Sequence, residues 1–158
     1  MTNILVAIDS SPSAMHAVGH AANLAAGMKD GARLSLIYVL PNLPAVFWDE
    51  GHILSDSEKA ERKSVVDRWI DAEKKKMEPL FGKALDLLVA RGIRRDAVTT
   101  KFLSDSTDAA ASILEEARDS SCSVVVVGRS HHSPKHVLGT TAARIANQAH
   151  GLAVAIVD

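Results

Sequence analysis

The six residues Cys122–Val127, which read CSVVVV, form the most β-branched run in the chain. β-Branched side chains favour extended backbone, and an uninterrupted apolar run is typical of a strand that is covered on both faces. Such a strand lies in the interior of a parallel sheet. We therefore expect an α/β fold built around residues 122–127.

Outward from this run, four further short apolar runs end in turn or helix-start residues and predict the other strands. They are Asn3–Asp9, Arg33–Val39, Ala97–Leu103 and Leu152–Val157. Apolar residues at helical spacing predict the intervening helices, which are Ser13–Met28, Ser57–Arg91, Ser106–Ser120 and the segment after the loop Gly128–Leu138. We expect Pro79 to break or kink the second helix, because a mid-helix proline loses a hydrogen bond and clashes with the preceding turn. The stretch Leu40–Asp56 has no clear period and is predicted to be a loop.

Strands that alternate with helices predict one α/β domain over residues 1–158, with a doubly wound parallel sheet. The composition agrees, since 47% of the 158 residues are hydrophobic. A formal net charge of −1 leaves no bulk field for a polyanion or an anionic membrane. The single cysteine, Cys122, cannot form an intramolecular disulfide. With no signal-like or membrane-spanning segment, we expect a soluble cytoplasmic protein.

Polar or glycine-rich sequence follows two of the predicted strands. Asp9–Ser11 follows the first strand, and Gly128–His132 follows the fourth. Ligands bind beyond the carboxyl ends of parallel strands where the strand order reverses, so these segments face each other if their strands are neighbours. The segment Gly139–Thr141 opens the last helix and can present N–H groups and hydroxyls to an anion. Asp9 and Ser11 are equally typical of helix N-caps, and that role does not exclude a ligand.

At these positions the sequence resembles the universal stress protein family over nearly its whole length. The resemblance lies in NILVAIDSSPSA (3–14), LSLIYV (34–39) and VVVVGRSHHSPKHVLGTTAARIANQAHGLAVAIV (124–157). It implies a five-stranded parallel sheet of order 3-2-1-4-5 with four flanking helices, the adenine-nucleotide α-hydrolase-like fold. It also implies a cytoplasmic homodimer that pairs through the last strand, here Leu152–Val157, and supports survival under stress rather than catalysing a defined reaction.

One branch of this family wraps ATP phosphates with a loop of the form Gly-x2-Gly-x9-Gly-Ser/Thr. The resemblance places adenine and ribose contacts at Ala7, Ile8, Asp9 and Val39. It places the phosphate loop at Val127, Gly128, Arg129, Ser130, His131, Gly139, Thr140 and Thr141.

The chain departs from that loop in two ways. His131 stands where the binding branch has glycine, and Gly139 follows Gly128 by eleven residues instead of thirteen. The side chain of His131 obstructs the close approach of backbone to phosphate, and the shorter loop encloses less space. Both changes therefore narrow the space that the loop leaves for phosphates. The sequence is closer to a branch with a shortened loop that is associated with no ATP binding. Against this, Gly139-Thr140 is kept, and Arg129 and Lys135 can neutralise phosphate charge.

The favoured hypothesis is thus a non-catalytic stress-response homodimer with weak or no ATP binding, and the alternative is an ATP-binding switch or slow ATPase. A third hypothesis is a hydrolase or metal enzyme that uses the loop histidines His131, His132 and His136. Neighbouring histidines point apart, and no acidic residue or cysteine lies in that loop, so we expect no metal site and no catalytic residue. His16 and His20 are predicted to lie on the solvated face of their helix.

Overall fold

The computed structural model describes residues 1–47, 51, 53–104, 108–129 and 138–158. Its centre is a five-stranded sheet of order β3-β2-β1-β4-β5, in which every neighbouring pair is parallel. This order confirms the fold that the family resemblance implies. The strands are β1 (Thr2–Ala7), β2 (Ala32–Val39), β3 (Val98–Leu103), β4 (Val124–Gly128) and β5 (Ala153–Val157).

Apolar residues on both faces of the inner strands explain why the sheet forms. In β1, Ile4, Leu5 and Val6 have no exposed surface, although successive side chains point to opposite faces. In β4, residues 125–127 are likewise buried, which confirms the prediction of an interior strand. Both strands therefore need a helical layer above and below.

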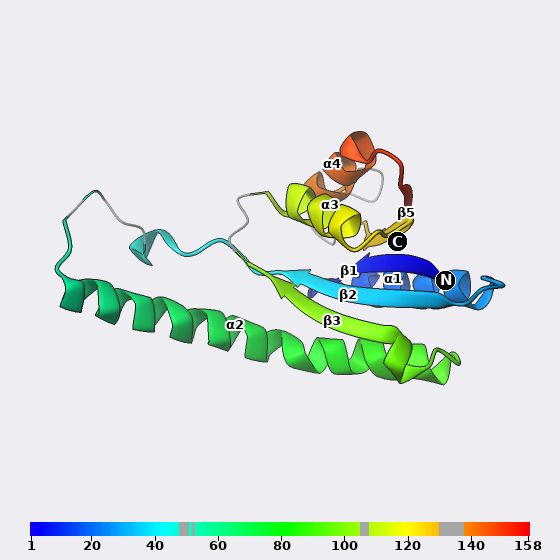
Figure 1. Cartoon of the computed structure of the whole chain (residues 1–158), viewed down its shortest axis with the longest axis horizontal. Helices are drawn as coiled ribbons and strands as arrows, with labels where there is room; N and C mark the ends of the chain where they lie inside the picture. The colour runs from blue at the N-terminus through cyan, green and yellow to red at the C-terminus, as the bar shows by residue number, and fades with distance from the viewer. Residues whose placement is uncertain (48–50, 52, 105–107, 130–137) are drawn as a thin grey trace.

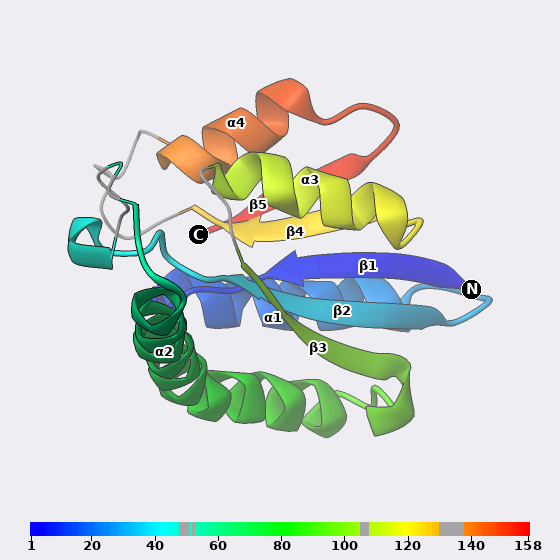
Figure 2. The same ribbon diagram turned by 60° about the vertical axis from the view of Figure 1, so that its left-hand side comes forward.

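Four helices supply these two layers, as Figures 1 and 2 show. They are α1 (Pro12–Ala26), α2 (Asp56–Ala90), α3 (Ala109–Asp119) and α4 (Thr140–Gln148), and two short 3₁₀ turns are η1 (Ala45–Phe47) and η2 (Arg95–Ala97). Helices α1 and α2 pack on the face that carries Ile4, Val6 and Leu36. Helices α3 and α4 pack on the face that carries Leu5, Ile37 and Val125.

Of the break or kink predicted at Pro79, the break does not occur in α2. The helix is not broken there but continues through the proline over 35 residues. It begins with a capping box, in which the Ser55 hydroxyl accepts the Glu58 N–H and the Glu58 carboxylate accepts the Ser55 N–H. Figure 2 shows that the axis of α2 changes direction along its length. Tertiary packing after residue 76 outweighs the local cost of the proline, because Met77 and Phe81 on either side of it are buried.

No helix among the described residues is both long enough and apolar enough to cross a membrane.

Candidate functional site

A cavity of about 420 Å³ lies at the carboxyl edge of the sheet, where the connections of β1 and β4 leave in opposite directions. Its volume is within the range of small-molecule sites. Its walls come from the ends of β1, β2 and β4 and from the first turns of α3 and α4. The cavity therefore occupies the switch point at which doubly wound sheets bind ligands.

Nine of the predicted site residues line this one cavity. They are Ala7, Ile8, Asp9, Val39, Val127, Gly128, Gly139, Thr140 and Thr141. Arg129 directly follows β4 but is not among the lining residues. Ser130 and His131 lie outside the described residues.

Four lining residues were missed by the reasoning from sequence: Tyr38, Ala109, Ile113 and Ala142. The sequence places Tyr38 in a predicted strand and the other three in predicted helices, without assigning any of them to a site. A usable signal was present, because a helix that follows a strand in a parallel sheet begins at the carboxyl edge of that sheet. The first turns of α3 and α4 therefore had to border the same space as the strand ends.

Three helices begin near this edge, and their N-termini differ in how they are capped. At α1, Ser11 occupies the N-cap position, but its side chain makes no cap hydrogen bond and lies 3.0 Å from the Ser13 hydroxyl. The Asp9 carboxylate instead accepts the Ser11 N–H at 2.8 Å. At α3, the Asp108 carboxylate accepts the N–H groups of Ala110 and Ala111.

Among the residues that the structure describes, helix α4 has no such cap. Its N-cap residue is Gly139, which has no side chain to accept an N–H. The first N–H groups of a helix need acceptors, and the helix dipole favours an anion at this end. The N-termini of α1 and α4 thus both lack a cap from their own N-cap side chain, and Gly139, Thr140 and Thr141 at the start of α4 line the cavity.

An ion pair ties the two helices that flank the cavity. Arg144 on α4 lies 2.9 Å from the Asp108 carboxylate, which also caps α3. This carboxylate therefore fixes the first turn of α3 and holds α4 beside it. Ala109, which follows Asp108, and Thr141 in the first turn of α4 both line the cavity.

Tyr38 is a neutral hydrogen-bonding group in the cavity wall. Burial, followed by the negative charges of Glu73 and Asp9, raises the pKa of its phenol above the ordinary value of 10.0. The hydroxyl therefore stays protonated at neutral pH. The ring meets Phe102 edge-on, with centroids 6.2 Å apart, which holds it in place.

Gly128 leaves no room for a side chain. A Cβ at this position would lie 2.5 Å from the Ser13 hydroxyl and 3.1 Å from the Ser13 carbonyl carbon. We expect Gly128→Ala to lower the free energy of unfolding by about 1–3 kcal/mol, the usual cost of overpacking. Denaturant unfolding measures this loss, and Gly82→Ala is the control, since a Cβ there meets nothing within 4 Å. Equal effects of the two substitutions would contradict the close contact at Gly128.

The described residues contain no group of three or more His, Cys, Asp or Glu side chains that could hold a metal ion. His131, His132 and His136 lie outside these residues. His16 and His20 are exposed on α1, as predicted. Burial raises the pKa of the Cys122 thiol, so this residue stays protonated and packs as a small core side chain.

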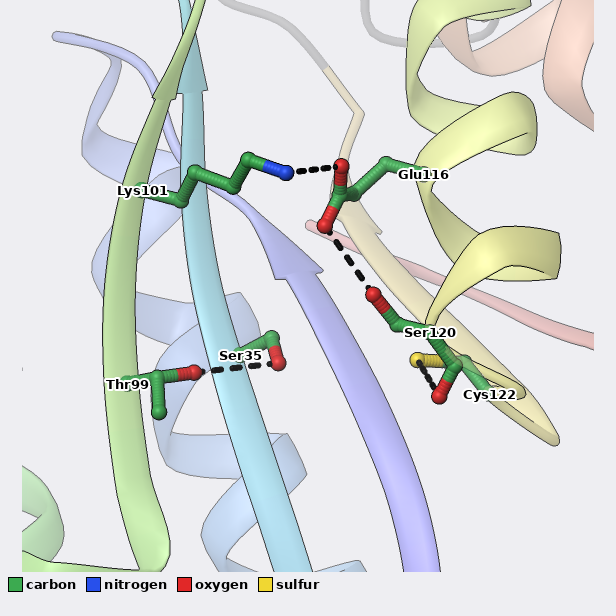
Figure 3. A network of polar contacts seen from close by, with 6 residues as sticks. All are labelled: Ser35, Thr99, Lys101, Glu116, Ser120 and Cys122. Carbon is green, nitrogen blue, oxygen red and sulfur yellow. Dashed lines mark hydrogen bonds and ion pairs between the residues drawn. The ribbon is translucent and has the colours of Figure 1, made fainter.

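A second polar network lies away from the cavity, between the edge strand β3 and α3 (Figure 3). Glu116 accepts hydrogen bonds from Lys101 at 2.6 Å and from the Ser120 hydroxyl at 3.0 Å. The hydroxyls of Ser35 and Thr99 lie 3.2 Å apart on the neighbouring strands. Lys101 and Glu116 satisfy each other, so this network joins β3 to α3 and has a structural role.

The chain was compared with known families and structures. The Universal stress protein family matches residues 1–157. No curated protein matches. Among solved structures, universal stress protein UspA from Lactobacillus plantarum is 21% identical, with a TM-score of 0.70, and the match covers 99% of this chain and 97% of that chain.

Two further solved structures have nucleotides in their names. A universal stress protein in complex with cAMP is 18% identical, with a TM-score of 0.65, and the match covers 99% of this chain and 97% of that one. The universal stress protein from Archaeoglobus fulgidus in complex with dAMP is 17% identical, with a TM-score of 0.61, and the match covers 100% of this chain and 98% of that one. These three likenesses are likenesses of fold, and the family match extends over nearly every residue. The chain therefore belongs to the universal stress protein family.

Proposed function

We propose that this protein is a non-catalytic stress-response module that acts as a cytoplasmic homodimer. Its cavity would hold an adenine nucleoside monophosphate and would bind the triphosphate only weakly. The observation that carries this proposal is the cavity at the switch point, which ends at the uncapped N-terminus of α4. The cAMP and dAMP complexes of two structures with the same fold agree with it.

The two ends of the cavity suit the two ends of such a ligand. Ala7, Ile8 and Val39 form an apolar wall for a base, and the Asp9 carboxylate can accept hydrogen bonds from ribose hydroxyls. Gly139 begins the opposite wall, where the N–H groups of α4 and the hydroxyls of Thr140 and Thr141 can donate to one phosphate. The loop after Arg129, which would have to hold further phosphates, is two residues shorter than the binding pattern requires.

The cavity offers little for chemistry. Among its described lining residues, Asp9 and Tyr38 are the titratable ones, and Tyr38 stays protonated. A general acid–base pair or an activated nucleophile needs two such groups with matched pKa values. We therefore assign binding rather than catalysis to this site.

The test is a charge placed at the α4 N-terminus. Thr140 is exposed at the first turn, where an acidic side chain favours the helix but repels phosphate. We expect AMP to raise the unfolding temperature of the wild type and of Thr140→Gln, and ATP to raise it less. We expect Thr140→Glu to remain folded and to lose most of the AMP shift.

Two outcomes would contradict this proposal: no shift of the wild type with millimolar AMP, or equal shifts of the Glu and Gln variants. Mass spectrometry of small molecules released from the purified protein gives an independent check.

The second candidate is an ATP-binding switch or slow ATPase that uses Asp9 and the segment Gly128–Thr141. The two threonine hydroxyls beside the uncapped helix favour it. It requires ATP to raise the unfolding temperature more than AMP does and requires phosphate release over time. No shift with millimolar ATP would remove it.

The homodimer rests on the open edge of the sheet at β5. Within the part of the chain that the structure describes, β5 pairs with β4 and has no strand on its other side. The residues Val154–Val157 are half-buried, so further cover would remove apolar surface from water. Pairing with β5 of a second copy would satisfy both edges at once. Light scattering that gives a monomer mass at micromolar concentration would contradict it.

A further inference from the structure

Helix α2 is much longer than the sheet it packs on. Its 35 residues span about 52 Å at 1.5 Å per residue, whereas the eight residues of β2 span about 27 Å. All of its buried residues fall in the second part: Met77, Phe81, Ala84 and Leu88. The first 21 residues, Asp56–Lys76, project past the sheet in Figure 1, and we name them the overhang.

A seam of six positions runs along the overhang at spacings of four and three residues. It consists of Glu58, Arg62, Val65, Trp69, Ala72 and Lys76. This spacing is that of the a and d positions of a coiled coil and keeps one face of a helix against a partner helix. The middle of the seam, Val65, Trp69 and Ala72, is apolar. Glu58 and Arg62 lie at one end and Lys76 at the other.

The described part of the chain covers this seam only in part. Phe47 of η1 packs on Trp69, with ring centroids 6.4 Å apart, and Arg62 donates to the Phe47 carbonyl. Val65 is nevertheless 37% exposed, and Val46 beside Phe47 is 82% exposed. A helix segment with no buried residue gains little from packing, and β-branched and aromatic residues weaken it further. An apolar seam on such a segment is explained by a partner.

We propose that the partner is a second copy of this chain, whose overhang lies antiparallel along the first. In a pair centred on residue 67, Val65 meets the partner's Trp69, and Glu58 meets the partner's Lys76. Twofold symmetry repeats each contact, so each Glu58 meets a Lys76 across the pair. The antiparallel arrangement also sets the two helix dipoles in opposite directions.

The charges that this pairing uses are accessible. Glu58 is exposed at the start of α2. The Lys76 side chain is 69% exposed, and its contact with Glu73 at 2.6 Å is a surface ion pair of small net value. Lys76 can therefore exchange that contact for one across the pair at little cost.

This contact is separate from the β5 edge. Helix α2 packs beside α1 and β3, at one side of the sheet, and β5 forms the opposite edge (Figure 2). A chain that used both contacts would form assemblies larger than a dimer. The test therefore uses Val154→Pro, which blocks pairing at β5, as the parent protein.

Two charge reversals test the seam in this parent. Glu58→Lys places lysines opposite each other twice, and Lys76→Glu places glutamates opposite each other twice. We expect the parent to form a dimer at high concentration in sedimentation equilibrium, and each reversal to weaken this dimer by about tenfold or more. A 1:1 mixture of the two reversed chains restores both Glu–Lys contacts, so it is expected to regain the affinity of the parent.

The mixture also controls for helix stability. Glu58→Lys removes the capping box and frays the start of α2. The frayed helix is present both in the Glu58→Lys protein by itself and in its mixture with the Lys76→Glu protein. Recovery in the mixture therefore reports charge complementarity across the pair. The proposal is overturned if the parent stays monomeric throughout the dilution series, if the reversals leave its dimer unchanged, or if the mixture stays as weak as its components. If the wild type forms a dimer and the Val154→Pro parent stays monomeric, the β5 pairing stands and the α2 contact is removed.

Discussion

Phe81→Ala is expected to lower the free energy of unfolding by about 3–5 kcal/mol, a large part of the 5–15 kcal/mol that a domain of this size typically has. Phe81 is 5% exposed and meets the ring of Phe102 edge-on at 5.0 Å between centroids. Its ring joins α2 to β3, and alanine would leave a cavity at this junction. Denaturant unfolding measures the loss.

Phe47→Ala is the matched control for this loss. It removes the same ring from η1, where the side chain is half-buried and packs on Trp69 of the overhang. We expect a cost of about 1 kcal/mol or less, because the overhang adds no buried residue to the core. Equal costs for the two phenylalanines would show that the overhang unfolds together with the core, contrary to the arrangement described above.

Val154→Pro is expected to convert the proposed β5-paired dimer into chains that no longer associate through that strand. The Ala153 N–H donates to the Ser123 carbonyl at 2.9 Å, and the Val157 carbonyl accepts from the Arg129 N–H at 2.8 Å. Because successive residues of a strand point their N–H and C=O groups to opposite sides, Val154 directs its own away from β4. Proline at position 154 removes an N–H group that β4 does not use and that β5 of a second copy can accept a hydrogen bond from. Edge strands tolerate proline at such a position.

Ala155→Pro is the control on the other side of the same strand. Residue 155 lies between 153 and 157 in register with β4, so proline at this position removes a hydrogen bond inside the chain. We expect Ala155→Pro to lower the unfolding temperature at every protein concentration. We expect Val154→Pro to lower the mass in light scattering and to reduce the concentration dependence of the unfolding temperature. A Val154→Pro protein with the mass of the wild type would exclude the β5 edge as an interface.

The positions of the strands could be predicted because each strand coincides with a short apolar run in the sequence. All five strands lie within two residues of their predicted ends, since a strand buried on both faces needs an uninterrupted apolar run. The strand order could not be predicted in this way. The sequence pattern restricted it to a few arrangements, and the family resemblance selected 3-2-1-4-5. Pairing between β1 and β4 joins residues that are about 120 positions apart, and no local pattern encodes such a distance.

Part of the candidate site could also be predicted from the sequence. Asp9, Gly128 and Gly139 stand where strands end or a helix begins, and their residue types mark those places in the sequence. Tyr38 carries no such mark, because it lies within a predicted strand, and its place in the cavity wall follows from the strand order and not from its residue type. The continuation of α2 through Pro79 was also beyond local rules, since buried residues on both sides of the proline decide it.

The place of β1 between β2 and β4 has a consequence for how the protein folds. β1 can pair with β2 as soon as the first forty residues are available, but its other edge waits for Val124–Val127, which come much later in the chain. Until then β1, whose residues Ile4, Leu5 and Val6 are fully buried in the folded protein, exposes one row of unpaired backbone groups. Contacts between residues so far apart in the sequence form late and slow folding. The interval before β4 pairs with β1 is therefore the one in which a growing chain is most exposed to aggregation.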